Sequence, residues 1–595
     1  MMTSDNPVIA RVCKHANYSV NRRDPLKDLL CAKLTLIYAD GRRENKFISI
    51  EDYKQPFYVV KEKYRKFKQP KDYIDKRMCK EFSSSRARLA YNISKTLNGI
   101  PDPRAELRQM KGSPYVFGCE QTTPVVFKQL YFDRYPQYQE TEPYTMAAYD
   151  VETDMFSERQ EVMMASVTFK DKAYFAARRG WYEEPDDETI LRKLKEAETT
   201  HLKEILDERG CTVQYELFDN EGEVVAACVG KFHEWQPDWI TSWNATYDME
   251  KNEEALLFNH IDPAKVYCDP SIPDEYKYYK LDKGRTHKEK ENGDKQSLEP
   301  QEKFPTVRTM ASWQWADAMS FYAIKRAPKG KLDSYKLEAI AQKEKVPGKM
   351  HPTEGSEYPP NTPEWHKHMQ RYHKYIYSMY NINDNFVIED INNKTDDFTY
   401  SLPMLIKSSE YFNYPSQPRV ISDALSFIAL KHGYVWGCVS GRKGNPYEDM
   451  LPDLRDWIAL LETEKNADFG RVLFEGLNDV ISRARGITDD IDVTGAYPTG
   501  TVALNISNKT TRMEVVKIQG ADRMKFREIA VNYASSPEAN AIGLCNSLFR
   551  FPQADTVTSV FEEKLKEMGK EHVVQSLRRA PGKEDVPSVL LDKVM

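Results

Sequence analysis

The chain has 595 residues, of which 40 % are hydrophobic and 30 % are charged, so it is long enough for several hydrophobic cores in about three or four domains. Its mean hydropathy is -0.68, and no uninterrupted apolar run approaches the ~18 residues that a membrane-spanning helix needs. These features predict a soluble protein. The net charge of -6 does not by itself indicate nucleic-acid binding.

The nine cysteines are scattered singly, with no Cys-x-x-Cys pair. This pattern is typical of reduced thiols and excludes a thiolate zinc site. The N-terminal segment lacks a basic stretch followed by an apolar core, so we expect no secretory signal. Together these features predict a cytoplasmic protein.

The N-terminal part of the chain is predicted to be rich in β-strands. The segments 32–38 and 46–50 have strand residue types and flank turn residues at 39–42, a pattern that predicts a hairpin. We take 1–140 as an N-terminal domain.

Basic and aromatic residues alternate in the segment 54–88. Cations beside stacking rings are what single-stranded nucleic-acid binding requires. A solvated face on a basic, helix-rich segment is the competing interpretation, and the sequence leaves both open. The residues concerned are Lys61, Lys63, Arg65, Lys66, Lys68, Lys71, Lys76, Arg77 and Lys80, with Tyr53, Phe57, Tyr58, Tyr64, Phe67 and Tyr73.

Two carboxylates, Asp150 and Glu152, end a predicted strand at 145–156. Residues i and i+2 of a strand point to the same face, so these side chains are expected to share one site. Two carboxylates held together favour a divalent cation with oxygen ligands. The alternative is an ordinary solvated strand end.

The chain then alternates between predicted strands and helices. A strand at 161–169 is expected to pair with the preceding one, and 186–209 is a charged helix. Apolar residues at 225–232 recur at helical spacing and predict a helix capped by Asp219 or Asn220. A turn between two strands is the alternative for this last segment.

A third carboxylate, Asp248, follows an apolar, strand-like run at 239–243 and is predicted to lie at the end of that strand. The lysine-rich stretch 277–303 has no periodicity, which predicts an exposed insertion or an extended hairpin. The segment 331–341 is predicted to be a helix with Ser334 as its cap.

A single helix is predicted from about 364 to 391, with Tyr380 and Asp384 one turn apart on the same face. A carboxylate on the apolar side of a helix is costly unless it is paired or bound to a metal. Asp384 is therefore a candidate ligand. Further helices are predicted around 422–431 and 454–465, and at 557–568.

The four carboxylates Asp150, Glu152, Asp248 and Asp384 come from two predicted strand ends and one predicted helix. If they converge, they would hold two divalent ions about 3.5–4 Å apart, the arrangement that clamps both oxygens in phosphodiester cleavage. Tyr380 is placed to orient the attacking water. Ligands without thiolate or imidazole favour Mg²⁺ or Mn²⁺ over zinc.

In order and spacing, these residues resemble the three motifs of the DnaQ-like 3′–5′ exonucleases: Asp150-x-Glu152, Asn244-x-x-Tyr247-Asp248 and Tyr380-x-x-x-Asp384. The match is closest to the proofreading domain of family B DNA polymerases of the T-even phage replicative type. The resemblance implies an RNase H-like domain with a mixed sheet and two Mg²⁺ or Mn²⁺ ions. It also implies substrate contacts from Asn244 and Tyr247.

A second resemblance begins at Asp492. The run Asp492-Val-Thr-Gly-Ala-Tyr497-Pro-Thr is similar to motif A of family B polymerases. It implies that Asp492 is a metal ligand of a polymerase site and that Tyr497 lies under the sugar of the incoming nucleotide. The later motifs, with Asn-Ser-x-Tyr-Gly and Asp-Thr-Asp, do not occur after Pro498, so the chain resembles the N-terminal two-thirds of a polymerase.

The expected fold is a multidomain protein of the α/β or α+β class. The predicted domains are a β-rich N-terminal domain at 1–140, an exonuclease domain at 141–400, a return segment at 401–475, a partial palm at 476–560 and the start of the fingers or a tail at 561–595.

The leading hypothesis is the N-terminal subunit of a split phage replicative polymerase, acting in the host cytoplasm. Its partners would be primer-template DNA, single-stranded 3′ ends, a sliding clamp and a second subunit that carries the fingers, thumb and remaining palm. One alternative is a free-standing exonuclease with a vestigial palm. Another is a non-catalytic protein that binds nucleic acid through the segment 54–88.

Overall fold

We analysed a computed structural model, in which the chain forms two compact units. Unit one comprises residues 1–59, 79–110 and 118–435, and unit two comprises 60–78, 111–117 and 436–595. The described residues are 6–66, 73–107, 110, 113–139, 141–285, 287–289, 295–437, 457–463 and 511–517. They form a mixed α/β structure, and no helix among them is long and apolar enough to cross a membrane.

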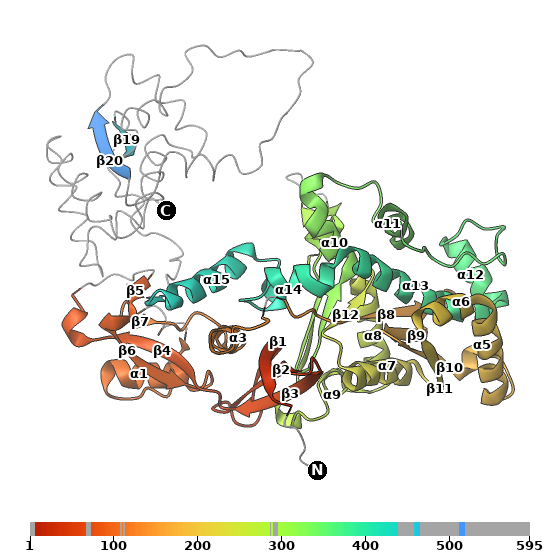
Figure 1. The fold of residues 1–595 in the computed structure, drawn as a ribbon, viewed down its shortest axis with the longest axis horizontal. Helices are drawn as coiled ribbons and strands as arrows, with labels where there is room; N and C mark the ends of the chain where they lie inside the picture. The colour runs from red at the N-terminus through yellow and green to blue at the C-terminus, as the bar shows by residue number, and fades with distance from the viewer. Residues whose placement is uncertain are drawn as a thin grey trace. The chain divides into compact units, whose positions relative to one another are not determined.

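Unit one is built around a six-stranded mixed sheet of order β11-β10-β9-β8-β12-β17 (Figure 1). The pairs β8–β9 and β9–β10 are antiparallel, whereas β10–β11, β8–β12 and β12–β17 are parallel. The strands are β8 (Met146–Thr153), β9 (Val162–Phe169), β10 (Lys172–Arg178), β11 (Thr212–Phe218), β12 (Trp239–Ser242) and β17 (Gln314–Asp317). The predicted pairing of 161–169 with the strand before it is confirmed.

Helices cover both faces of this sheet. The helices α7 (Glu221–Trp235) and α8 (Ala245–Phe258) pack on one face through a core that includes Tyr149, Val167 and Phe232. The helices α5 (Asp187–His201) and α13 (Lys374–Thr395) pack on the other face (Figure 1). Helices therefore cover the central strands of the sheet on both faces.

Most predicted helices of unit one are present. The charged segment forms α5 and α6 (Lys203–Arg209), and α7 confirms the helical interpretation of 225–232. The Asn220 side chain caps α7 by accepting a hydrogen bond from the Glu223 N–H at 3.0 Å. The lysine-rich insertion is an extended hairpin, in which β13 (Tyr279–Asp282) pairs with β16 (Thr306–Thr309).

Two helix predictions in unit one were wrong in detail. The single helix expected from 364 to 391 is two helices, α12 (Pro363–Tyr372) and α13, separated at His373, whose φ of -133° is not helical. The helix α11 (Leu337–Glu344) begins after Lys336, so Ser334 is not its cap. The Ser334 hydroxyl instead accepts a hydrogen bond from the Lys336 N–H in the preceding turn.

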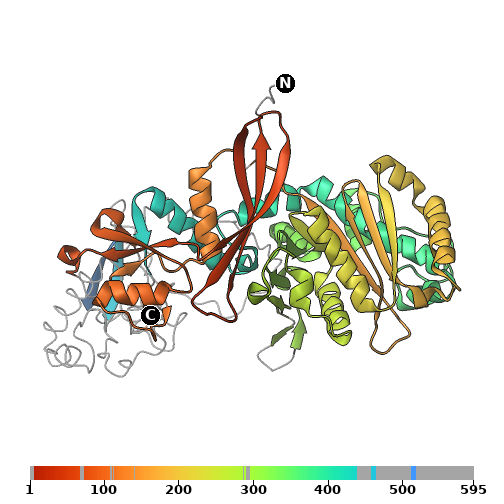
Figure 2. The same ribbon diagram turned by 90° about the horizontal axis from the view of Figure 1, so that it is seen from below.

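The N-terminal strands form a separate three-stranded sheet, visible as the red ribbon in Figure 2. The strand β2 (Asp28–Tyr38) lies between β1 (Val8–Val20) and β3 (Arg43–Glu51), and both neighbours are antiparallel to it. The predicted hairpin is thus confirmed. Its turn contains Gly41 with φ of +85°, a left-handed conformation that favours glycine.

The basic segment is not helix-rich in its described residues. It forms β4 (Gln55–Val60), β5 (Tyr73–Asp75) and β6 (Cys79–Ser84), with single 3₁₀ turns between them. Phe57 and Tyr58 are buried, so these two rings cannot stack on a nucleic acid. The proposed basic helical face is therefore wrong, and the stacking interpretation loses two of its rings.

The last predicted helices have different outcomes. The helix around 422–431 is α15 (Gln417–Lys431), whereas the helix expected at 454–465 is a strand, β19 (Trp457–Thr463), paired antiparallel with β20 (Thr511–Lys517). The apolar run 457–461 fits a strand as well as a helix, and pairing with β20 decides it. The predicted helix at 557–568 and the five predicted domain ranges stay predictions, and the helix lies outside the described residues.

Candidate active site

The strand β8 carries Asp150 and Glu152 on the face that is covered by α13. Their neighbours Tyr149 and Val151 belong to the core against α7 and α8, whereas Ala148 packs in the core that includes α13. The alternation of side chains along the strand therefore places both carboxylates on the α13 side. The same-face prediction for this pair is confirmed.

The helix α13 presents a polar stripe to these carboxylates. The Tyr377 hydroxyl donates a hydrogen bond to Glu152 Oε2, and Asn381 Nδ2 donates to Asp150 Oδ2 at 2.6 Å. Tyr377, Asn381 and Asp384 follow the i, i+4, i+7 spacing of one helix face. The sequence interpretation missed Tyr377 and Asn381, although this spacing relative to Asp384 could have found them.

Asp248 lies on a helix and not at a strand end, which corrects the prediction for this residue. The strand β12 ends at Ser242, and Asn244, with φ of +68°, turns the chain directly into α8. Asp248 therefore occupies the first turn of α8, where the positive end of the helix dipole stabilises a carboxylate. Its charge still acts on Asp150.

Burial and mutual repulsion raise the pKa values of the four carboxyl groups. Burial raises the pKa of Glu152 to about 7, although the Tyr377 hydrogen bond opposes that shift. Burial, followed by the charges of Glu152 and Asp248, raises the pKa of Asp150 well above its usual value. Burial also raises the pKa values of Asp248 and Asp384. Such a cluster favours the binding of cations.

One cation of the protein already contacts this cluster. Lys349 Nζ forms an ion pair with Asp384 Oδ2 at 2.5 Å and donates a hydrogen bond to the Tyr380 hydroxyl at 2.6 Å. Lys349 lies in the segment between α11 and α12, where its backbone N–H donates to Glu338 Oε2 at 2.7 Å. Because this segment has no periodicity, Lys349 could not be predicted from the sequence.

The carboxylate oxygen atoms of the cluster suit a hard divalent cation. Asp384 Oδ1 is buried and has no hydrogen-bond partner among the described residues, so it is available as a ligand. No three His, Cys, Asp or Glu side chains of the described chain are already grouped as a metal-binding set. Binding therefore requires the carboxylates to turn toward a common point, and their oxygen chemistry suits Mg²⁺ or Mn²⁺.

The predicted substrate-binding residues have different positions. Tyr247 is 37 % exposed, and its hydroxyl is 2.6 Å from the hydroxyl of Thr153 at the end of β8. Tyr247 thus lies beside the carboxylates, at the open side of the site. Asn244 precedes α8 as described above. Asp492 and Tyr497 lie outside the described residues.

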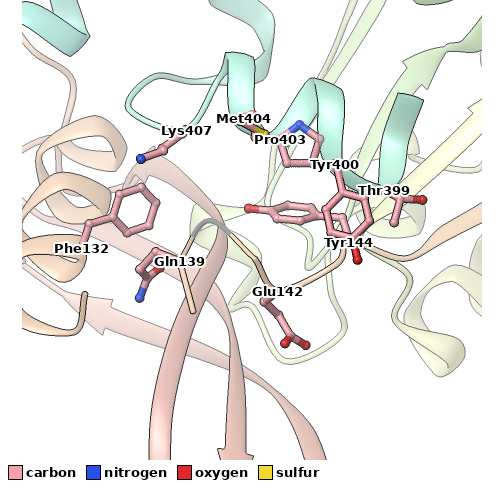
Figure 3. Close-up of a pocket in the computed structure, with 9 residues that line it drawn as sticks. All are labelled: Phe132, Gln139, Glu142, Tyr144, Thr399, Tyr400, Pro403, Met404 and Lys407. Carbon is pink, nitrogen blue, oxygen red and sulfur yellow. The ribbon is translucent and has the colours of Figure 1, made fainter. Parts of the chain in front are cut away.

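A small pocket elsewhere in unit one is not part of this site (Figure 3). Phe132 of α3 (Thr123–Arg134) lies on one side of it, and Tyr144 and Tyr400 lie on the other. None of the four carboxylates lines it. The carboxylate cluster is therefore the candidate active site.

Comparison with known proteins does not assign the chain to a family. A scan against protein-family models finds no match, and a search of curated proteins finds no similar sequence. The functional argument therefore rests on the geometry and chemistry of the site.

Proposed function

We propose that the carboxylate cluster is the active site of a metal-dependent 3′–5′ exonuclease with an RNase H-like arrangement of its mixed sheet. The observation that carries this proposal is the convergence of four carboxylates from β8, α8 and α13, of which Asp248 and Asp384 are buried and Asp150 and Glu152 are partly buried. Residues up to 234 positions apart repel one another here at a cost to folding. Active sites are where such arrangements are retained.

Each residue of the site would have a separate role in phosphodiester hydrolysis. Asp150, Glu152, Asp248 and Asp384 would hold two divalent ions, which supply a water-derived nucleophile and stabilise the charge on the leaving oxygen. The Tyr380 hydroxyl, which contacts Lys349 beside Asp384, would orient the attacking water. Tyr247 and Asn244 would contact the 3′-terminal nucleotide.

The larger assignment is also a proposal, supported by the resemblance at Asp492 and Tyr497. The chain would be the N-terminal subunit of a split family B replicative DNA polymerase of the phage type, with proofreading as its own activity. A second subunit would supply the fingers, thumb and remaining palm. Primer-template DNA and a sliding clamp would be further partners in the host cytoplasm.

The decisive experiment measures nucleotide release from a 5′-labelled single-stranded oligonucleotide by the purified chain. With Mg²⁺ we expect stepwise shortening from the 3′ end. In Asp384→Ala we expect a loss of about a thousandfold, because metal stabilisation of the transition state contributes several kcal/mol. Release that persists in EDTA, or at an unchanged rate in Asp384→Ala, would contradict the proposal.

A matched control lies on the same helix. Asp390 lies on α13, away from the carboxylate cluster, and forms an ion pair with Arg209 of α6. Asp390→Ala is expected to retain exonuclease activity, so a loss in both variants would indicate damage to α13 rather than to the site.

The alternatives give different results in the same assays. Asp492→Asn should abolish polymerisation by the reconstituted pair of subunits and should have no effect on a free-standing exonuclease. A non-catalytic binding protein would show nucleic-acid affinity that falls steeply with salt and no Mg²⁺-dependent shortening.

A further inference from the structure

Glu152 is held by a chain of buried hydrogen bonds that lies outside the three sequence motifs. The Tyr377 hydroxyl donates to Glu152 Oε2, and Nδ1 of His366 lies 2.8 Å from the same hydroxyl. Tyr377 is completely buried. The side chains come from two consecutive helices, with His366 on α12 and Tyr377 on α13.

When Glu152 is ionised, the hydrogen bonds of this chain point in one direction. A tyrosine hydroxyl has a single proton, and here the carboxylate of Glu152 accepts it. The Tyr377 oxygen must therefore accept from His366, which places the imidazole proton on Nδ1. Burial and the nearby charge of Lys349 lower the pKa of His366 to about 4, so the imidazole is neutral and has one N–H to donate.

The backbone that follows Glu152 is fixed from the same helix. The buried side-chain amide of Gln370 on α12 donates to the Thr153 carbonyl at 2.9 Å and accepts from the Met155 N–H at 3.0 Å. These two hydrogen bonds of Gln370 hold the end of β8, and its Nε2 also donates to the Tyr377 hydroxyl at 3.4 Å. The Glu152 side chain and the backbone that follows it are thus oriented by residues of α12 and α13.

The two helices are separated by a break at His373. Its non-helical backbone turns α12 away from the axis of α13, and α12 still contacts α13. In a continuous helix, His366 and Tyr377 would lie on one face but about 16 Å apart along the axis, too far for the hydrogen bond between them. The break therefore allows residues of α12 to contact Tyr377 of α13 and the end of β8.

We propose that Tyr377, supported by His366 and Gln370, is a positioning residue that fixes the Glu152 carboxylate as a metal ligand. The inference rests on the proposed exonuclease function. Partners that orient a metal ligand typically affect metal affinity or activity by about 10–100-fold. Removing the Tyr377 hydroxyl should therefore weaken metal binding without removing a ligand.

The test is a calorimetric Mn²⁺ titration of the full chain, restricted to the binding that Asp150→Ala removes. In Tyr377→Phe we expect about tenfold or greater loss of Mn²⁺ affinity, with nucleotide release restored toward the wild-type rate at high Mn²⁺. The matched control is Tyr375→Phe, which removes a hydroxyl on the same helix that bonds Glu184 instead. Unchanged Mn²⁺ affinity in Tyr377→Phe would overturn the inference.

Two further outcomes are informative. If circular dichroism shows that Tyr377→Phe is unfolded, Gln370→Met gives the same test from the backbone side, and unchanged affinity there would overturn the inference. If the wild type binds Mn²⁺ but releases no nucleotide, the proposed function fails while a weaker Tyr377→Phe titration still supports the positioning role. A wild type that binds no Mn²⁺ overturns both.

Discussion

Unit one contains two clusters of charged side chains, one buried and one partly buried, that differ in their balance of positive and negative charge. In the first, Asp238 is surrounded by Lys33, whose Nζ lies 2.7 Å from Oδ1, by Lys14 and by His15, whose Nε2 contacts the Asp238 carbonyl at 2.8 Å. Although burial alone would raise the pKa of Asp238, the two lysines hold it well below its usual value. This cluster joins the N-terminal sheet to the strand β12.

The carboxylate cluster has the opposite balance. The pKa values of Asp150, Glu152, Asp248 and Asp384 are raised, and the partly buried Lys349 acts on three of them, Asp150, Glu152 and Asp384.

A buried carboxylate with sufficient cations contributes to the fold, whereas an excess of carboxylates makes a site that needs ions from outside. Charge balance therefore separates the structural cluster from the candidate active site.

The largest effect is expected at the structural cluster. Asp238→Asn leaves Lys33 buried without a counter-ion and leaves Lys14 only the charge of Glu142. Breaking a buried pair in this way typically costs about 3–5 kcal/mol. Urea unfolding of the metal-free chain should show this loss. A change below 1 kcal/mol would break the distinction between the clusters.

Acid is expected to weaken the same cluster. Burial lowers the pKa of His15 from 6.5 to about 3, so the unfolded chain binds a proton that the folded chain does not. Its contribution to stability is present above pH 6.5 and is lost as the pH falls toward 3, by up to about 1.4 kcal/mol per pH unit.

The control for the acid effect is His15→Gln, which retains a donor near Asp238 but cannot titrate. Unfolding free energies measured between pH 7 and pH 4 should fall more steeply for the wild type than for this variant. Parallel curves would show that His15 is not the acid-sensitive group.

The smallest change in the free energy of unfolding is expected at the candidate active site, and it has the opposite sign. In EDTA at pH 8, Asp150→Asn should stabilise the chain by about 1 kcal/mol, as substitutions that relieve functional strain commonly do. The new amide still accepts the hydrogen bond from Asn381. Saturating Mg²⁺ should reverse the order, because a ligand that binds only the folded state stabilises it.

The same substitution, aspartate to asparagine, is thus expected to destabilise one cluster and stabilise the other. Thermal unfolding of Asp150→Asn and Asp238→Asn side by side tests this directly. If both variants lose stability in EDTA, the carboxylate cluster is a structural feature and the proposed site loses its physical basis.

The sequence by itself determined those features that depend on local periodicity. The two-residue period of a strand placed Asp150 and Glu152 on one face, and the helical period placed Tyr380 and Asp384 together. The Asn220 cap and the hairpin of β2 and β3 could also be predicted from the sequence, because each depends on residues that are neighbours in the chain.

Only the tertiary structure decided the remaining features of the site. The left-handed turn at Asn244 places Asp248 on a helix, the break at His373 brings α12 to the end of β8, and a segment without periodicity delivers Lys349 to Asp384. Each depends on contacts between residues far apart in the sequence. Local propensity carries no information about such contacts, and the balance of charge in a buried cluster is set by them.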